Sequence, residues 1–279
     1  MMQLSSLKAF IIDMDGVLWQ GNQAFDGIEN FFSTLRDKNI KFVLATNNAS
    51  HTRKQYVEKL RSMNVLIAEE EIITSGTATA HYLSQTNDAA STRVYVIGED
   101  GAREPLRELG FTLTEEYELT DQLKHTHGAD IVVCGKDHAL TWDKLATATL
   151  NINAGALFIG TNADTSLPTE RGVIHGNGAI LAALHTATRV QPVIIGKPEP
   201  FIYQQALSLL GTTIDETIAI GDRLETDILG AVRTGMRSIL VLSGIATHAE
   251  VIGSAYQPTW IMQDIQAITN AIRLLPKVK

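Results

Sequence analysis

The feature that most constrains the fold is a series of short apolar runs, each of which stops abruptly at Gly, Asp, Asn or Thr. The segments between these runs carry apolar residues at the three- and four-residue spacing of amphipathic helices. Continuous apolar strands that alternate with helices are typical of βαβ units built around parallel sheets. The runs lie at residues 8–13, 41–48, 94–101, 130–137, 156–164, 193–198, 217–223 and 238–244.

The order of these segments predicts two domains. A chain of 279 residues is long enough for two modest hydrophobic cores, and the strands are too many for one short sheet. The polar residues that follow strands gather near the two ends of the sequence, while the middle has strands and helices of its own. The sequence therefore predicts an α/β protein with a parallel-sheet core of residues 1–90 and 191–279. A smaller α/β domain is inserted at residues 91–190.

Composition narrows the location and the partners. No stretch approaches the roughly 18 apolar residues that a membrane span needs, and the first ten residues lack the basic and apolar segments of a secretory signal. A single cysteine, Cys134, excludes an intrachain disulfide. The net charge of −8 argues against a nucleic-acid backbone as the main partner. We therefore expect a cytoplasmic protein without membrane or nucleic-acid partners.

The first apolar run ends in two acidic residues, Asp13 and Asp15, followed by Gly16. Alternate residues of a strand share a face, and a bend at the glycine would bring both carboxylates to one small volume. Two such carboxylates suit a nucleophile that stays ionised and an acid that carries a proton. The alternative is that one aspartate caps the turn while the other is solvated. Trp19, just beyond, is compatible with core packing or with substrate contact.

Two further strand ends carry groups that suit an anion. The segment 44–50 ends in a hydroxyl and two amides before a helix, which is an arrangement that binds anions. The alternative is an ordinary helix cap by Asn48 or Ser50. Lys197 follows another strand, and Pro198 restricts its backbone. An ammonium group so placed can hold an anionic nucleophile and a phosphate together, whereas the alternative is a surface lysine in a proline-rich turn.

The segment 218–231 reads as a strand, a glycine, Asp222 and then a helix that starts near Thr226 or Asp227. Asp222 lies where oxygen ligands could bind a hard cation. Asp227 could cap the helix or orient its neighbours. The alternative for Asp222 is a turn aspartate.

Together, and in this order, the four segments resemble a known family. The sequences DMDGV, ATNN, GKP and GDRLETD are similar to the motifs of the haloacid dehalogenase-like phosphohydrolases. The nearest branch is the one that contains NagD-type nucleotide phosphatases, 4-nitrophenylphosphatases, phosphoglycolate phosphatases and pyridoxal phosphate phosphatases. The resemblance implies a Rossmann-like core, and the insertion matches the position of that branch's α/β cap.

The resemblance implies a Mg²⁺-dependent phosphatase that forms an aspartyl-phosphate. Asp13 would be the nucleophile, and Asp15 would protonate the leaving oxygen and then deprotonate the attacking water. Thr46 and Asn47 would bind the transferring phosphoryl group, and Lys197 would steady Asp13 and the phosphate.

The same resemblance gives the metal ligands and the supporting residues. Mg²⁺ would be held by the carboxylates of Asp13 and Asp222 and by the backbone carbonyl of Asp15. The metal and Lys197 would nearly balance the charge of the two aspartates and a phosphate dianion. The supporting residues would be Asp227, Gly16 and Asn48.

The substrate is expected to be a small phosphorylated metabolite. The sequence does not distinguish among nucleotides, sugar phosphates, pyridoxal phosphate and phosphoglycolate. Arg223 and Glu225 stand at positions that differ among members of the branch, and the residues between Asp222 and Asp227 are candidates for substrate contact. A homodimer formed through the cap is also expected from the family. The candidate substrate contacts are Arg223, Leu224, Glu225 and Thr226.

Two other functions use the same acidic site. A phosphoacceptor or binding domain would bind Mg²⁺ and accept phosphate for signalling, but it would need no inserted domain and would give Asp15 no role. A phosphotransferase would return the phosphoryl group to a substrate rather than to water.

Overall fold

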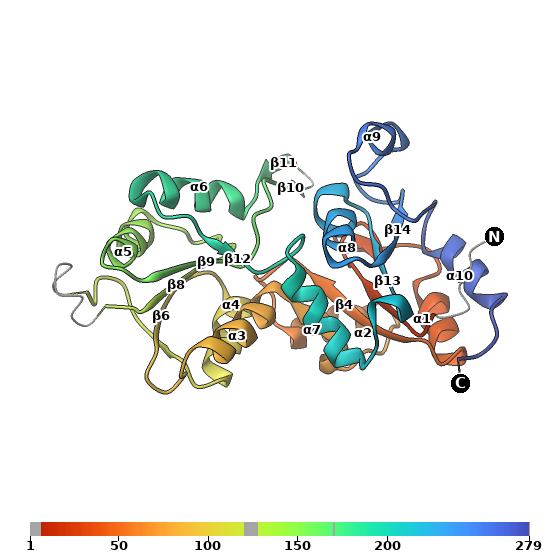
Figure 1. The fold of residues 1–279 in the computed structure, drawn as a ribbon, viewed down its shortest axis with the longest axis horizontal. Helices are drawn as coiled ribbons and strands as arrows, with labels where there is room; N and C mark the ends of the chain where they lie inside the picture. Colours follow the sequence, from red (N-terminus) through yellow and green to blue (C-terminus); the bar gives the residue numbers. More distant parts are fainter. Residues whose placement is uncertain (1–6, 120–127, 170, 279) are drawn as a thin grey trace. The chain divides into compact units, whose positions relative to one another are not determined.

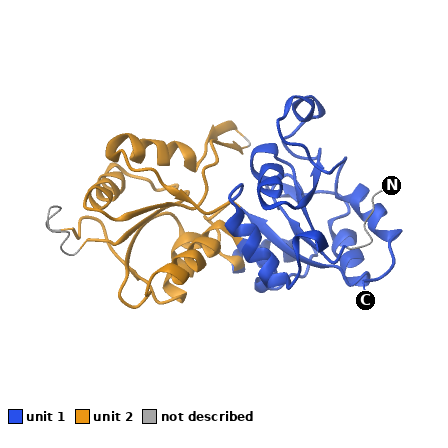
Figure 2. Cartoon of the chain, in the orientation of Figure 1, with its two compact units in different colours: residues 1–46, 54–73, 197–279 blue, residues 47–53, 74–196 orange. Residues whose placement is uncertain are grey.

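The computed structural model describes residues 7–119, 128–169 and 171–278. The described residues form two compact units, drawn in different colours in Figure 2. Unit 1 comprises residues 1–46, 54–73 and 197–279, and unit 2 comprises residues 47–53 and 74–196. Each unit is built on a parallel sheet with helices, which confirms the predicted α/β class (Figure 1).

The sheet of unit 1 has six strands in the order β15-β14-β13-β1-β4-β5. The pairs from β15 to β4 are parallel, and Ile12 of β1 lies beside both Ile220 of β13 and Leu44 of β4. This register brings the carboxyl ends of the three central strands to one level. The strands are β1 (Ala9–Ile12), β4 (Lys41–Thr46), β5 (Ile72–Thr74), β13 (Thr217–Gly221), β14 (Arg237–Val241) and β15 (Trp260–Met262).

Every residue of β1 is buried, as expected for a central strand whose two faces are both covered. The first helix shows how the cover forms, because Ile28, Phe31, Phe32 and Leu35 recur at helical spacing and are all buried. A short hairpin of β2 (Trp19–Gln20) and β3 (Gln23–Ala24) follows β1. The helical segments are α1 (Ile28–Asp37), α2 (Arg53–Ser62), η1 (Glu69–Glu71), α7 (Pro200–Leu210), η2 (Ile214–Glu216), η3 (Leu224–Ile228), α8 (Leu229–Thr234), α9 (His248–Gly253) and α10 (Ile265–Arg273).

The main sheet of unit 2 has five strands in the order β12-β9-β8-β6-β7, and all of its pairs are parallel. A separate antiparallel hairpin is formed by β10 (Ser166–Thr169) and β11 (Gly172–His175). The strands of the main sheet are β6 (Arg93–Ile97), β7 (Thr112–Leu113), β8 (Ile131–Cys134), β9 (Leu157–Gly160) and β12 (Val193–Ile194). The helices are α3 (Ser75–Thr86), α4 (Asp100–Glu108), α5 (Trp142–Asn153) and α6 (Asn177–Thr188).

The bounds of the units differ from those expected for the core and the inserted domain, because residues 47–53, 74–90 and 191–196 lie in unit 2. For residues 74–90 the cause is the close packing of α3 on α4. A methyl group at Gly76 would lie 2.0 Å from the carbonyl oxygen of Gly101, so the two helices touch backbone to backbone. The assignment of a catalytic core and a specificity cap stays a prediction.

Within residues 7–119, 128–169 and 171–278, no helix is long and apolar enough to cross a bilayer. The expected cytoplasmic location stays a prediction.

Candidate active site

The carboxyl edge of the unit 1 sheet gathers side chains from separate parts of the sequence. Asp13 directly follows β1, Asp222 directly follows β13, and Thr46 is the last residue of β4. All three are buried. In open parallel sheets this edge is the usual place for a ligand, and the strand register accounts for the meeting of residues about two hundred positions apart.

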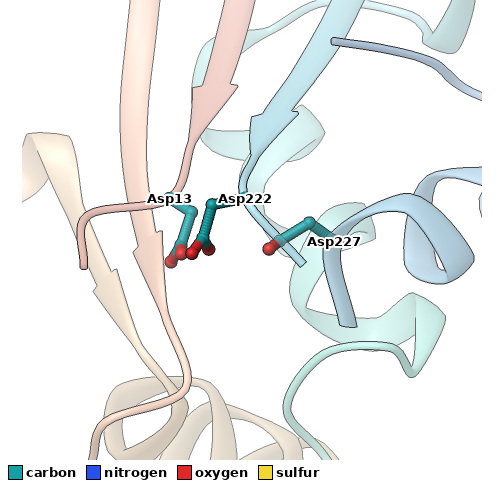
Figure 3. A group of neighbouring side chains, drawn as sticks. All are labelled: Asp13, Asp222 and Asp227. Carbon is teal, nitrogen blue, oxygen red and sulfur yellow. The ribbon is translucent and has the colours of Figure 1, made fainter. Parts of the chain in front are cut away.

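Three buried carboxylates meet at this edge (Figure 3). Asp13, Asp222 and Asp227 each offer one oxygen, and these oxygens lie within 4.8 Å of one another. Asp227 comes from the short helical segment η3 rather than from a strand end. Carboxylates this close, out of water, repel one another strongly unless a cation lies among them.

Lys197 supplies one such cation. Its ammonium group donates to Asp13 Oδ1 at 2.6 Å and to Asp227 Oδ1 at 2.7 Å, and the residue is only 4% exposed. Burial acts to lower the pKa of Lys197, but the charges of Asp13 and Asp227 more than offset it and hold that pKa above its ordinary value. The lysine is therefore charged across the neutral range and bridges two of the three acids.

One lysine does not balance three carboxylates. Burial raises the pKa of Asp13 well above its ordinary value, Lys197 opposes this, and the charges of Asp227 and Asp222 add to the rise. With all four groups ionised the cluster carries three negative charges and one positive charge. A bound divalent cation would neutralise the remainder.

Asp222 has the geometry of a metal ligand. The Ile245 backbone N–H donates to its Oδ2 at 2.9 Å, whereas its Oδ1 is buried and accepts no hydrogen bond from the described residues. Methyl groups at Gly16 and Gly244 would lie 2.2 and 2.0 Å from Oδ2, so two glycines let the backbone close around the carboxylate. Burial, then the charge of Asp227, raises the pKa of Asp222 to about 7. A buried carboxylate oxygen without a donor fits a hard, oxygen-seeking cation such as Mg²⁺.

Asp227 accepts hydrogen bonds both from the backbone beside its own helical segment and from Lys197. Its Oδ2 accepts from the Arg223 backbone N–H at 3.1 Å, while its Oδ1 accepts from Lys197. The Tyr203 hydroxyl donates to the Asp227 carbonyl at 3.1 Å.

The expectation that a helix starts near Thr226 or Asp227 and is capped by Asp227 is wrong, because η3 begins at Leu224, contains Asp227 and has no side-chain cap hydrogen bond. The supporting role of Asp227 stays a prediction.

Gly221 makes the approach of Asp227 possible, and this gives a first prediction. A methyl group at Gly221 would lie 2.2 Å from both Cβ and Cγ of Asp227. Gly221→Ala should displace Asp227 and with it Lys197, and a displacement near 1 Å can lower activity by about 10²-fold. The measurement is kcat on an aryl phosphate.

The matched control is Gly253→Ala, since nothing lies within 4 Å of a methyl group at that glycine. The control should keep both the activity and the thermal midpoint of the original protein. A Gly221→Ala protein with unchanged kcat would show that the position of Asp227 is unimportant.

Asp15 is not among the three carboxylates whose oxygens lie within 4.8 Å of one another, and its side chain is exposed. Its Oδ1 accepts a hydrogen bond from the indole Nε1–H of Trp19 at 2.8 Å. Between them Gly16 has a φ of 82°, in the left-handed region, which turns the chain after β1 as the sequence predicted. The Gly16 backbone N–H donates to the Trp19 carbonyl at 2.8 Å and closes this turn.

The residues after β4 divide between the units. Thr46 belongs to unit 1, whereas Asn47 and Asn48 belong to unit 2. Within unit 2, Asn47 Nδ2 donates to Asp164 Oδ1 at 2.9 Å. Asn48 Oδ1 accepts from the backbone N–H and the hydroxyl of Ser50 at 3.0 and 2.7 Å, which is a local turn contact. Their phosphate-binding and supporting roles stay predictions.

The predicted substrate contacts lie between the two acids of the last motif. Leu224 is buried in an apolar cluster with Ile228, Leu240, Ala246 and Val251. Glu225 is exposed, and Arg223 and Thr226 are half-buried. The substrate roles of these four residues stay predictions.

Sequence reasoning missed the loop after β14. The Ser243 hydroxyl donates to the Gly16 carbonyl at 2.8 Å, and the Ile245 N–H holds Asp222. The sequence did carry a signal for this loop. The apolar run 238–244 ends in Ser-Gly, just as the runs before Asp13 and Asp222 end in polar residues at the same edge of the sheet. The contact of Tyr203 with Asp227 was also missed, and no local pattern indicates it.

Comparison with known proteins identifies the family. A family model described as haloacid dehalogenase-like hydrolase matches residues 10–112, and a HAD-hydrolase-like model matches residues 194–268. The 5'-nucleotidase YutF of Bacillus subtilis (strain 168) is 38% identical, over 92% of this chain and 95% of its own. The acid sugar phosphatase of Staphylococcus aureus (strain USA300) is 38% identical, over 94% of this chain and 96% of its own.

Solved structures agree with the sequence relatives. The crystal structure of a glycerol phosphate phosphatase from Mycobacterium tuberculosis in complex with magnesium has a TM-score of 0.86 and is 30% identical. That match covers 97% of this chain and 79% of the other. The chain therefore belongs to the haloacid dehalogenase-like hydrolases, in the branch that its four motifs predicted.

Proposed function

We propose that this hydrolase is a Mg²⁺-dependent phosphatase of small phosphate monoesters that works through a phosphorylated Asp13. The observation that carries the proposal is the buried cluster in which Lys197 bridges Asp13 and Asp227 while Asp222 Oδ1 has no hydrogen-bond donor among the described residues. The family and the printed names of the relatives, a 5'-nucleotidase and an acid sugar phosphatase, support the substrate class.

In the first step a carboxylate oxygen of Asp13 attacks phosphorus, and the bond from phosphorus to the ester oxygen breaks. Lys197 holds the attacking carboxylate through its bond to Asp13 Oδ1. Asp15, in its protonated form, gives a proton to the departing oxygen. The products of this step are the free alcohol and an acyl phosphate on Asp13.

In the second step Asp15 takes a proton from a water molecule, whose oxygen attacks phosphorus. The bond between phosphorus and Asp13 breaks, which restores the carboxylate and releases inorganic phosphate. Asp13, Asp222 and the Asp15 carbonyl would hold Mg²⁺. When bound, the metal would offset the charge of the phosphoryl oxygens.

The test is the release of inorganic phosphate from 4-nitrophenyl phosphate, with MgCl₂ and with EDTA. We expect turnover with Mg²⁺ and its loss with EDTA. A folded, metal-loaded protein that releases no phosphate would contradict the proposal, and phosphate that reappears on an added acceptor would indicate a phosphotransferase. A panel of nucleotides, sugar phosphates, pyridoxal phosphate and phosphoglycolate would then define the substrate.

A second prediction concerns Asp222 and the metal. The folded protein keeps a proton on Asp222 up to about pH 7, whereas the carboxyl in the unfolded chain ionises near 3.8. Between these values the folded state binds more protons, so the contribution of Asp222 to metal-free stability falls as the pH rises. Mg²⁺ needs the ionised form and should therefore stabilise the protein more at about pH 8 than at about pH 5.

The variant Asp222→Asn should lose both effects. Thermal unfolding with EDTA or with MgCl₂, at both pH values, measures them. The expected result is a midpoint that rises with Mg²⁺ in the original protein and stays constant in the variant. Equal stabilisation of the two proteins by Mg²⁺ would remove Asp222 from the proposed metal site.

The remaining expectations, that the protein forms a homodimer through unit 2, lies in the cytoplasm and binds no nucleic acid, stay predictions.

A further inference from the structure

Trp19 makes a contact that the proposed reaction does not yet use. The residue has no exposed surface, yet its indole N–H ends at the exposed Asp15, where it donates to Oδ1 at 2.8 Å. Hydrogen bonds from a buried donor to a carboxylate are stronger and more directional than neutral ones. The indole therefore holds one oxygen of the Asp15 side chain, and no hydrogen bond to the other oxygen is found among the described residues.

The indole is itself held firmly. Helix α2 contributes the ammonium group of Lys59, which lies 4.3 Å from the ring centre and donates to the Gly21 carbonyl at 2.9 Å. The ring of Tyr56 stacks on Trp19 with centroids 6.4 Å apart. The turn after β1 adds the bond from the Gly16 N–H to the Trp19 carbonyl. Contacts from the ring and from the backbone leave the indole little freedom to turn.

We infer that Trp19 is a positioning residue for Asp15, which it aims at the leaving oxygen by fixing one carboxylate oxygen and leaving the other for proton transfer. Because Trp19 has no exposed surface, it acts through Asp15 rather than by touching the substrate. The inference rests on the proposed function, since it needs Asp15 to serve the leaving group.

The test compares two substrates that differ in how much help the leaving group needs. Phenol resembles the tyrosine side chain, with a pKa of about 10, whereas 4-nitrophenol is a stronger acid and departs without a proton. A misplaced Asp15 should therefore slow phenyl phosphate more than 4-nitrophenyl phosphate. The quantity to measure is kcat/KM, which reports the first chemical step for each substrate.

The variant Trp19→Phe removes the N–H and keeps an aromatic ring. We expect it to lower kcat/KM for phenyl phosphate about tenfold more than for 4-nitrophenyl phosphate, because a misplaced acid loses part of the roughly 10²- to 10⁴-fold that a positioned acid contributes. A second variant with 3-benzothienylalanine at position 19 keeps the ring shape and lacks only the N–H, so it covers the case in which Trp19→Phe misfolds. The control is Trp142→Phe, at a tryptophan that is 84% exposed.

The outcomes distinguish the positioning role of Trp19 from the proposed phosphatase function. A selective loss with phenyl phosphate in either variant, and none in the control, supports the positioning role. Equal loss with both substrates, or no loss, overturns it while leaving the phosphatase intact. An original protein that hydrolyses neither ester contradicts the proposed function itself.

Discussion

The Asp13→Asn variant is expected to lose hydrolysis of 4-nitrophenyl phosphate by about 10⁴-fold or more, within the range seen when an enzyme loses its covalent nucleophile. An amide oxygen carries no charge and cannot form a stable bond to phosphorus. The side chain keeps its size, and its oxygen can still accept from Lys197 at the place where Oδ1 now accepts. The measurement is kcat with saturating Mg²⁺.

The same variant should fold as well as the original protein, or better. Burial raises the pKa of Asp13, and the neighbouring Asp227 and Asp222 raise it further, so its ionised form is costly in the folded state. Removing that charge leaves two carboxylates around one ammonium. With EDTA present, the unfolding midpoint should therefore equal or exceed that of the original protein.

The matched control is Asp26→Asn, at an exposed aspartate of the same unit. It should change neither kcat nor the midpoint. Retention of more than about a tenth of the original rate by Asp13→Asn would contradict the nucleophile role. A tenfold loss corresponds to only about 1.4 kcal/mol of activation free energy, which is far less than the loss of a covalent nucleophile should cost. A large loss of stability would instead mean that the ionised carboxylate holds the site together.

Much of the site could be predicted because it depends on strand order and strand ends. A parallel sheet brings its carboxyl ends to one edge, so polar residues that follow strands are candidates to meet. Asp13 and Asp222 do so at positions far apart in the sequence. Lys197 does not follow a strand of this sheet, because β12 pairs in the sheet of unit 2, so its bond to Asp13 does not follow from the shared edge. The α/β class followed from the same pattern of apolar runs.

Contacts that depend on side-chain packing could not be predicted in this way. Trp19 was compatible with core packing or substrate contact, and only the folded chain shows the bond from its indole to Asp15. The close approach of Gly76 to Gly101, which places α3 in unit 2, joins residues 25 positions apart without any periodic signal. Both contacts depend on tertiary packing, which local sequence propensity does not predict.

Replacing Lys197 tests how the buried charges are balanced. In Lys197→Met the cluster of three carboxylates loses the ammonium that bonds to two of them, Asp13 and Asp227. Removing one partner from a buried ion cluster costs about 3–5 kcal/mol of stability, so the metal-free variant should unfold at a lower temperature near pH 7. Its kcat should fall about 10³-fold, because the group that holds Asp13 is gone.

The pH dependence of that loss has a definite sign. The pKa of Lys197 is raised in the folded state, so its stabilising contribution is complete below the ordinary lysine value and is lost only as the pH rises through the raised one. In the variant, the pKa values of Asp13 and Asp222, already raised, should rise further. The folded variant then binds more protons than the unfolded chain. The amount by which the variant is less stable than the original protein should therefore shrink as the pH falls from about 7 toward 4. Urea unfolding with EDTA at both ends of this range measures the change.

Two further variants separate charge from geometry. Lys197→Arg keeps a positive charge but presents a planar fork in place of a compact ammonium, so it should recover part of the stability and little of the kcat. Lys54→Met, at an exposed lysine of α2, should match the original protein in both. Rates close to the original in Lys197→Met would show that Lys197 has no role in catalysis. A deficit that grew at low pH would mean that the three carboxylates are not what the lysine balances.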